Sequence, residues 1–276
     1  MQSETAILVM SCDAYSDLWH DFAVLKKKYW ADCEYPTYLV TNKTECKEEG
    51  IKTICCGDNL NWTGRLLFAL NEVKSKYVIL LLEDYYITNT VDSKTVKDVV
   101  EFIKDNNVKY YKLEERAWLD ANYYNNSSYL KLIDDKVPYG ISLVSSIWDV
   151  SFLQAILDGQ DYPAWEFEVR RNQPNDISKG RNDLCLADSR NILQIEHMVQ
   201  RGKYIRSAVK RVESRGDILT KKRGLLSPLM CLYLDFHIWL KNYPSFFSFM
   251  TKCYKFFGGK TVSEKYMEEI NNNKYK

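Results

Sequence analysis

The sequence predicts an α/β fold with a mostly parallel central sheet flanked by helices, followed by a helical C-terminal extension. Short apolar runs alternate with helix-length segments through the first two thirds of the chain, which is typical of a parallel sheet with covered faces. Residues 77–82 form an uninterrupted apolar run, as expected of a strand buried on both faces. The chain has 276 residues, enough for one large domain with a small appendage.

The spacing of apolar residues predicts the individual elements. Strands are expected at 7–10, 37–40, 52–56, 77–82 and 108–113, and helices at 17–28, 62–74 and 93–105. Further along, strands are expected at 141–146 and 192–198, and helices at 149–157 and 163–171, with Asp149 as an N-cap and Pro163 near a helix start. The polar residues 172–190 are expected to form a loop, and residues after 204 mainly helices. We therefore expect a main domain at 1–215 and a helical extension at 216–276.

Composition excludes several classes of protein. The 38 Lys and Arg residues nearly balance the 37 Asp and Glu residues, so no overall field attracts nucleic acid, and no nucleic-acid partner is expected. The eight cysteines form no CxxC pair and have no zinc spacing, and the N-terminus lacks a secretory pattern. We therefore expect reduced cysteines and a cytoplasmic location.

A C-terminal segment, residues 225–257, is rich in Leu, Phe, Tyr and Trp with interspersed Lys. Its uninterrupted apolar runs are shorter than the roughly 18 residues that a membrane-spanning helix requires. Two interpretations stay open for it. The segment forms either amphipathic helices on a membrane surface, which would place the chain at the inner face of the membrane, or helices packed on the main domain.

The sharpest candidate site is the pair Glu83 and Asp84, which directly follows the apolar run 77–82. Ligands of open α/β sheets bind beyond the carboxyl ends of the strands. Two carboxylates at that place can hold Mg²⁺ or Mn²⁺, and the ion would neutralise a diphosphate leaving group. From spacing alone, loop charges after a core strand are an equally good interpretation.

Three further segments carry candidate donor-binding residues. Ser11 and Asp13 follow the first strand and can bind a base or ribose, although either one can instead cap the next helix. Arg65 lies in the first turn of a helix and can face a phosphate, whereas its alternative role is a solvated surface charge. Arg201 and Lys203 flank a glycine, which suits a pyrophosphate but is equally typical of a basic turn.

Two later acids, Glu166 and Glu168, lie two positions apart on a predicted helix, so they point to different sides and only one is expected to face a pocket. A carboxylate beside aromatic rings can act as a general base. His197 is interpreted as a satisfied core histidine. The chain has no GxGxxG, P-loop or GxSxG motif, and its three histidines lie in unrelated segments, so a zinc site or a histidine-centred triad is not expected.

Taken in order, the segments SCDAYSDLW (11–19), KKYWADCEYPTYLVTN (27–42), WTGRLLFAL (62–70), YVILLLEDYYI (77–87), AWEFE (164–168) and VQRGKY (199–204) resemble bacterial glycosyltransferases of capsule and O-antigen polysaccharide biosynthesis. The resemblance covers about the first 215 residues, which would then be the catalytic domain. It implies a GT-A-like, Rossmann-like fold. It also implies transfer of a sugar from a nucleotide-diphosphate sugar to a glycan or lipid-linked acceptor.

The resemblance also implies roles for individual residues. Ser11, Asp13 and Tyr15 occupy the place where such enzymes hold the nucleotide, and Trp62 lies beside the predicted phosphate-facing Arg65. The usual Asp-x-Asp metal motif is replaced by Glu83-Asp84-Tyr85-Tyr86, so cationic side chains are expected to supply positive charge instead. The acid that serves as catalytic base in such enzymes corresponds to Glu166 or Glu168.

Two other functions remain alternatives. A sugar-phosphate nucleotidyltransferase shares a Rossmann-like sheet and acidic metal ligands. It usually needs a glycine-rich phosphate loop after the first strand, however, and Ser11-Cys12-Asp13 supplies none. The second alternative is a non-catalytic module that binds a nucleotide or a glycan.

Overall fold

The structure is a computed structural model that describes residues 3–114, 121–135, 137, 139–241, 243–256, 258–260, 264–265 and 268. The chain divides into two units, Met1–Leu226 and Ser227–Lys276. This division falls after residue 226 rather than after the expected 215, because residues 217–223 are bonded to the first helical segment of the chain. Thr220 donates two hydrogen bonds to Asp21 through its backbone N–H and hydroxyl, and Arg223 forms an ion pair with Asp17.

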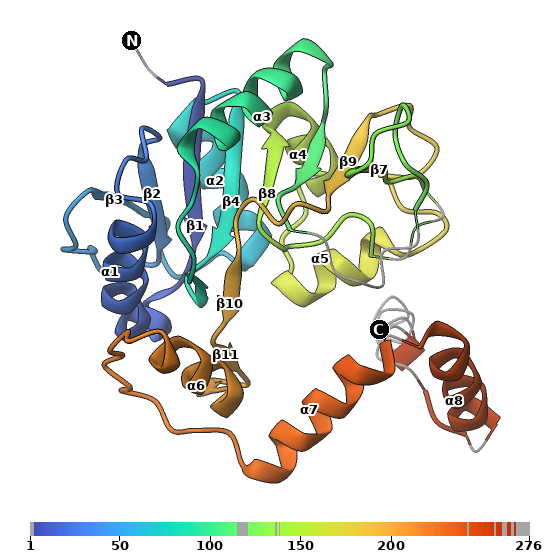
Figure 1. The fold of residues 1–276 in the computed structure, drawn as a ribbon. Coiled ribbons are helices and arrows are strands. Elements are labelled where there is room, and N and C mark those ends of the chain that lie inside the picture. Colours follow the sequence, from blue (N-terminus) through green and yellow to red (C-terminus); the bar gives the residue numbers. More distant parts are fainter. Residues whose placement is uncertain are drawn as a thin grey trace. The chain divides into compact units, whose positions relative to one another are not determined.

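The central sheet of the first unit has eight strands in the order β3–β2–β1–β4–β8–β6–β9–β7 (Figure 1). Strands β1 to β4, β6 and β9 run in one direction, while β8 and β7 run against their neighbours. The predicted α/β fold with a mostly parallel sheet is therefore confirmed. The strands are β1 (Thr5–Met10), β2 (Thr37–Thr41), β3 (Ile51–Cys55), β4 (Tyr77–Leu82), β6 (Tyr110–Lys112), β7 (Leu130–Leu132), β8 (Ser146–Asp149) and β9 (Cys185–Asp188).

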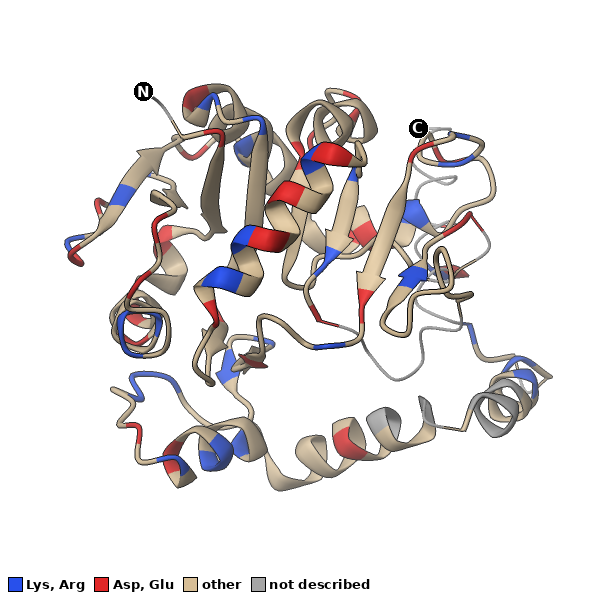
Figure 2. Cartoon of the chain, turned by 45° about the horizontal axis from the view of Figure 1, so that its top comes forward, with Lys and Arg blue, Asp and Glu red and all other residues tan. Residues whose placement is uncertain are grey.

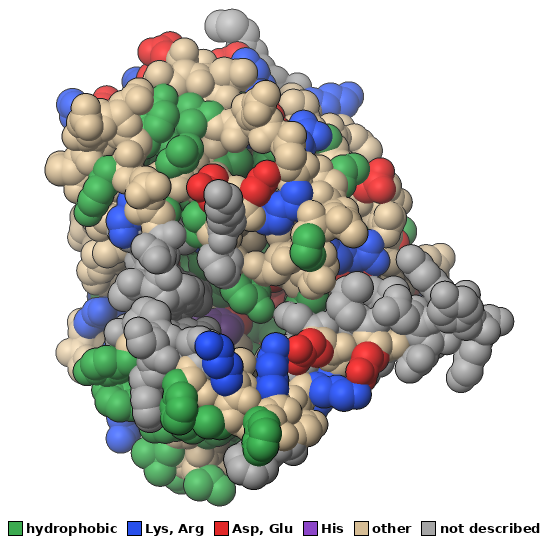
Figure 3. Space-filling model, turned by 90° about the vertical axis from the view of Figure 1, so that its right-hand side faces the viewer, with side chains coloured by type: hydrophobic (Ala, Val, Ile, Leu, Met, Phe, Trp, Pro, Cys, Tyr) green, Lys and Arg blue, Asp and Glu red, His purple; other side chains and the backbone are tan. Residues whose placement is uncertain are grey.

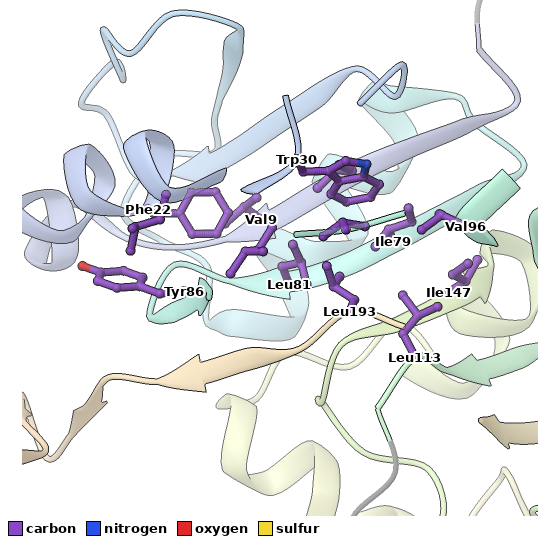
Figure 4. Close-up of a cluster of buried hydrophobic side chains, with 14 of the residues drawn as sticks. Val9, Phe22, Trp30, Ile79, Leu81, Tyr86, Val96, Leu113, Ile147 and Leu193 are labelled. Carbon is purple, nitrogen blue, oxygen red and sulfur yellow. The ribbon is translucent and has the colours of Figure 1, made fainter. Parts of the chain in front are cut away.

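Alternation along the strands gives the sheet two apolar faces, and helices cover both. On one face, Val9 of β1 and Leu81 of β4 point towards Phe22 of α1 (Trp19–Tyr29), while Ile79 and its neighbours meet Val96 of α3 (Ser93–Asp105; Figure 4). The outer side of α3 is solvated, with acidic and basic positions alternating along it (Figure 2). The other face packs on α2 (Trp62–Val73), α4 (Val150–Leu157) and α5 (Ala164–Arg171).

Three local predictions are wrong and one cap is confirmed. The expected strand at 141–146 is shifted, because β8 begins at Ser146. The expected loop 172–190 contains β9, whose sequence Cys-Leu-Ala-Asp is too short for a periodic signal between polar neighbours. A 3₁₀ helix, η1 (Asp13–Leu18), precedes α1, so helical structure begins earlier than residue 17. Asp149 caps α4 as predicted, accepting a hydrogen bond from the Phe152 N–H at 3.0 Å.

Short elements lie beyond the carboxyl edge of the sheet. Strand β5 (Tyr85–Ile87) pairs antiparallel with β10 (Ile195–His197), and β11 (Val199–Gln200) pairs with β12 (Lys203–Tyr204). Helix α6 (Arg206–Ser214) follows. The second unit contains α7 (Pro228–Lys241) and α8 (Pro244–Phe256). Among the described residues, no helix combines the length and hydropathy needed to cross a membrane.

Candidate functional site

Glu83 and Asp84 follow β4 at the carboxyl edge of the sheet. Since β1 and β4 pair in parallel with Met10 opposite Leu82, the segments that follow both strands leave the sheet side by side, and the Glu83 N–H donates to the Met10 carbonyl at 3.3 Å. Both acids are buried, with exposed fractions of 9% and 7%. They are therefore enclosed at the place where open α/β sheets bind ligands.

Burial dominates the electrostatics of Glu83. Burial first, and then the charge of Asp84, raise the pKa of Glu83 to about 8, while the positive charges of Arg65 and Arg223 act in the opposite direction. Near neutral pH the Glu83 carboxyl is thus largely protonated. Two guanidinium groups from distant parts of the sequence lie within electrostatic reach of it.

Asp84 has a direct partner, His197, with 3.0 Å between Oδ2 and Nε2. The β5–β10 ladder sets this pair, because His197 lies opposite Tyr85 and the Met198 N–H donates to the Asp84 carbonyl at 2.9 Å. Sequence reasoning interpreted His197 as a core residue, but its side chain is 43% exposed. The only sequence signal was its place in the predicted strand 192–198, just before Arg201 and Lys203.

Arg65 reaches the ends of β1 and β2 from the first turn of α2. Its Nη1 donates to the Ser11 carbonyl at 2.8 Å and to the Asn42 side-chain oxygen at 3.3 Å. Its Nε is buried and lacks a hydrogen-bond acceptor among the described residues. Arg65 thus retains an unused donor, which is a costly state for a buried polar atom.

Two backbone N–H groups at the N-terminus of α2, which the phosphate-binding interpretation would use, are already bonded to a protein carboxylate. Asp161 accepts hydrogen bonds there from the backbone N–H groups of Asn61 at 2.9 Å and Gly64 at 3.0 Å. A Cβ at position 64 would lie 2.7 Å from the Asp161 carboxylate, so the close approach depends on glycine. The anion preferred at a helix N-terminus is supplied by the protein itself.

The first-strand candidates play different parts. The Ser11 hydroxyl accepts a hydrogen bond from the Trp19 indole at 2.7 Å, so it is engaged in packing. The Asp13 carboxylate accepts from the backbone N–H groups of Asn42, Lys43 and Thr44 and from the Thr44 hydroxyl. Burial opposes the charge, yet these hydrogen bonds lower the pKa of Asp13 below its ordinary value. Asp13 therefore builds the loop after β2 and caps no helix.

Tyr15 lies beside Arg223, a residue that sequence reasoning missed. The Arg223 guanidinium lies over the Tyr15 ring at 4.1 Å and forms two hydrogen bonds with the Asp17 carboxylate, at 2.8 and 2.6 Å. Burial, followed by the charge of Glu83, raises the pKa of Tyr15. No motif surrounds Arg223 in the sequence. It reaches Tyr15 and Asp17 because the segment that follows α6 folds back to η1.

The β11–β12 hairpin carries the other two expected cations. Arg201 and Gly202 form its two-residue turn, with φ angles of +50° and +72°, the combination that a type I′ turn requires. Arg201 and Lys203 are both exposed. The Gly202 carbonyl accepts from Arg223 at 3.5 Å, which ties this basic turn to η1.

A cavity of about 400 Å³ lies beside Arg65. Its lining does not include Glu83, Asp84, His197, Arg201, Lys203 or Arg223. This volume falls within the usual range of small-molecule sites. Trp62 forms part of its wall, is 9% exposed and packs on Phe167 with 6.1 Å between ring centres. The lining comes from the ends of β1 and β2 and the starts of α2 and α5: Cys12, Ala14, Asn42, Leu60, Asn61, Trp62, Arg65, Pro163 and Ala164.

Glu166 and Glu168 have separate local partners on α5, the helix that begins at this cavity. Glu166 is buried and forms an i,i+4 ion pair with Arg170, whose Nε lies 2.7 Å from Oε1. Glu168 accepts a hydrogen bond from the Leu143 N–H at 2.8 Å. Glu168 therefore anchors the 142–143 loop, whereas Glu166 lies in the turn nearest the cavity.

The donor set for a metal ion is small. Within the described ranges, no group of three or more His, Cys, Asp or Glu side chains could hold one. Asp84 and His197 are in contact, and Glu83 is adjacent but largely protonated. Mg²⁺ commonly binds through one or two carboxylates together with water and substrate phosphates, so the set fits only an ion that shares oxygens with a diphosphate.

Comparison with known proteins finds solved structures with a similar backbone fold. No known family matches the chain, and no curated protein does. Similar solved structures include S. aureus TarS, with 12% identity and a TM-score of 0.41 over 67% of this chain and 36% of that chain. Another is S. aureus TarS 1–349 in complex with UDP-GlcNAc, with 12% identity and a TM-score of 0.40 over 67% of this chain and 58% of that chain.

A third is a cytidylyltransferase from Leptospira borgpetersenii serovar Hardjo-bovis, with 11% identity and a TM-score of 0.39 over 82% of this chain and 100% of that chain. The chain spans less than two thirds of the TarS chains. At these identities and TM-scores the likenesses assign neither an activity nor a substrate to this chain.

Proposed function

We propose that the chain is a GT-A-like glycosyltransferase that uses a nucleotide-diphosphate sugar in cell-surface polysaccharide synthesis, as in capsule or O-antigen pathways. One observation carries the proposal. Two buried acids follow β4, and the charges of Arg65 and Arg223 act on the first of them, Glu83. Arg65 also lines a cavity of about 400 Å³. Opposite charges enclosed at a strand end suit a diphosphate donor.

In this proposal the nucleotide takes the cavity, against Trp62 and the loop that follows β2. Arg65 stabilises the diphosphate as negative charge develops on the leaving group, using the Nε for which the described residues provide no acceptor. Arg201 and Lys203 add positive charge from the exposed hairpin. Asp13 acts indirectly, by holding the 42–44 loop that lines the cavity.

Asp84 is proposed to orient the donor sugar, with His197 fixing the position of its carboxylate. Asp84 is also the proposed ligand for Mg²⁺ or Mn²⁺, joined by Glu83 once that group is ionised. Such an ion would supply positive charge to the diphosphate. Adding back Mn²⁺ after chelation, with transfer as the readout, tests this part.

For an inverting reaction, Glu166 or Glu168 is proposed as the base that deprotonates the acceptor hydroxyl of a glycan or lipid-linked acceptor. Both acids have a protein partner, Arg170 for Glu166 and the Leu143 N–H for Glu168. We choose Glu166 first, because it lies in the turn of α5 nearest the cavity. Loss of the acidic limb of the pH–rate profile in Glu166→Gln but not in Glu168→Gln would support that choice, because a general base stops acting once it is protonated. The reverse pattern would assign the role to Glu168.

A sugar-phosphate nucleotidyltransferase is the second candidate, and a non-catalytic binding module the third. The segment after β1 forms η1 and contains no glycine-rich loop for a triphosphate, which disfavours the nucleotidyltransferase. The module predicts nucleotide binding without turnover. Product analysis with a bound donor separates all three, since only the glycosyltransferase releases a nucleoside diphosphate.

A thermal-shift panel of UDP-, GDP-, CMP- and dTDP-sugars, with and without Mn²⁺, tests donor binding. A ligand at about 100 times its Kd stabilises the native state by about 2.7 kcal/mol, which is several degrees for a protein of this size. The shift should shrink in Arg65→Met and persist in Lys97→Met, a matched change on the exposed side of α3. If no nucleotide sugar in the panel raises the melting temperature, the proposal is overturned.

A further inference from the structure

The second unit exposes an unusual apolar surface on α7. Leu229, Leu232, Tyr233, Phe236 and Trp239 recur at helical spacing, so they lie on one side of the helix. Their exposed fractions range from 48% to 78%. Soluble helices normally bury such a stripe, and an exposed one marks an interaction surface.

Aromatic rings extend this surface. Phe236 stacks on Trp239 with 5.9 Å between ring centres, and Trp239 contacts Tyr243 at 4.9 Å. On α8, Phe249, Tyr254 and Phe256 are also exposed. Tyr and Trp favour the polar–apolar boundary of a bilayer, where a ring and a polar group are both accommodated.

Charge selects the kind of partner. Helix α8 carries Lys252 and Lys255 and no acid. In the sequence of the second unit, residues 227–276, seven Lys outnumber four Asp and Glu, a formal charge of +3, although the whole chain is nearly neutral. Lys255 of α8 also forms an ion pair with Glu264 at 2.7 Å. The face of the molecule shown in Figure 3 carries hydrophobic side chains together with both basic and acidic ones. Such a surface complements anionic lipid, and two cationic copies would repel each other.

We propose that the exposed apolar face of α7, with the rings and lysines of α8, binds the surface of an anionic lipid bilayer. The helices lie in the interface, with apolar side chains among the acyl chains and lysines at the headgroups. The proposal is independent of the proposed function, because lipid binding needs no donor.

Vesicle flotation of the full chain tests the proposal, using phosphatidylcholine vesicles with and without 30% phosphatidylglycerol. The chain should float with the anionic vesicles and much less with the neutral ones, and added salt should weaken binding. Leu232→Asn/Phe236→Asn should lower the partition coefficient about tenfold or more. Phe68→Asn, which changes an exposed ring on α2 in the first unit, should leave it unchanged.

Circular dichroism of both variants establishes that they are folded. A second variant, Lys252→Gln, keeps the apolar face and should reduce only the preference for anionic vesicles. Absence of flotation in every vesicle would overturn the proposal. So would sedimentation of the wild type as a dimer that the α7 variant dissociates, because the face would then be an interface between two copies.

Discussion

The acids of the candidate site fall into two regions that differ in how their charge is compensated. Asp13 and Asp161 accept hydrogen bonds mainly from backbone N–H groups and hold, respectively, the loop after β2 and the start of α2. Glu83 and Asp84 are more buried than these two acids. Glu83 is held above its ordinary pKa, and Asp84 forms an ion pair with a half-exposed histidine side chain. We therefore treat Asp13 and Asp161 as structural acids, and Glu83 and Asp84 as the acids that the proposed function assigns to the ligand.

Burying an acid whose charge is not fully met by hydrogen bonds or counter-charges lowers the stability of the fold. A protein retains such an acid where the group serves a purpose other than folding. The comparison therefore divides the site into a structural side, with Asp13 and Asp161, and a chemical side, with Glu83 and Asp84. Substitutions on the two sides should separate stability from activity.

The largest expected effect is that of Asp84→Asn on turnover. Removing the charge that orients the donor should lower kcat by about 10²–10³-fold, the scale found when a group that stabilises the transition state is lost. Stability should change by less than about 1 kcal/mol, because the amide keeps the size of the side chain. Transfer assays and urea unfolding measure the two quantities. Asp98→Asn, an exposed acid on α3 paired with Lys94, is the matched control.

If Asp84→Asn unfolds the protein at lower urea while retaining turnover, Asp84 belongs with the structural acids and the comparison fails. If both turnover and stability survive, the proposed site is wrong. Retained nucleotide binding with no turnover in the wild type itself would instead support a binding module.

The second effect is that of Asp13→Asn on stability. The amide has one acceptor oxygen where the carboxylate accepts from several N–H groups, and its own NH₂ would face those donors. We expect a loss of about 2 kcal/mol of unfolding free energy, since hydrogen bonds to charged groups contribute about 1.5–3 kcal/mol. Because the pKa of Asp13 is lowered, the wild-type contribution is present above the ordinary pKa of Asp and fades as the pH falls through the native value.

Urea unfolding at pH 7 and pH 3.5 checks this expectation: the gap between wild type and Asp13→Asn should narrow at the lower pH. A constant gap would show that the amide loses packing and not charge-assisted hydrogen bonds. A variant as stable as the wild type would move Asp13 to the chemical side of the site.

Sequence patterns predicted the structural scaffold better than the partners of the site. Periodicity located β1, β4, α2 and α3, because each of these elements buries a regular apolar pattern. The four residues of β9 gave no such signal and acquire strand structure only by pairing with β6 and β7. Pairing across the sheet is a tertiary property and leaves no local trace.

The same reason explains which site residues were predicted. Glu83 and Asp84 follow a recognisable strand, so the rule that ligands bind at strand ends found them. His197 and Arg223 reach the site from over a hundred residues away, by a short ladder and by an ion pair with Asp17. Asp13 was identified as a ligand or a helix cap, but its carboxylate serves a loop that no spacing rule connects to it.

The smallest expected effect tests the chemical side directly and has the opposite sign. The native pKa of Glu83 is raised to about 8, so between the ordinary value near 4.5 and about 8 the native state keeps a proton that the unfolded state has released. Stability due to this group therefore falls as the pH rises through that window. Glu83→Gln cannot ionise and should escape the fall, so its stability relative to the wild type should rise between pH 5.5 and pH 8.5. The cost of burying the amide is the same at both pH values and does not change this rise.

Urea unfolding at the two pH values measures that gain, with Glu101→Gln on the exposed side of α3 as the control. A gain that is equal at both pH values would mean that Glu83 is ionised throughout and well compensated, like Asp13 and Asp161. The division between structural acids and acids assigned to the ligand would then have no basis. If the gain in stability grows with pH and turnover is lost, the Glu83 carboxyl lowers the stability of the wild type and is also required for activity.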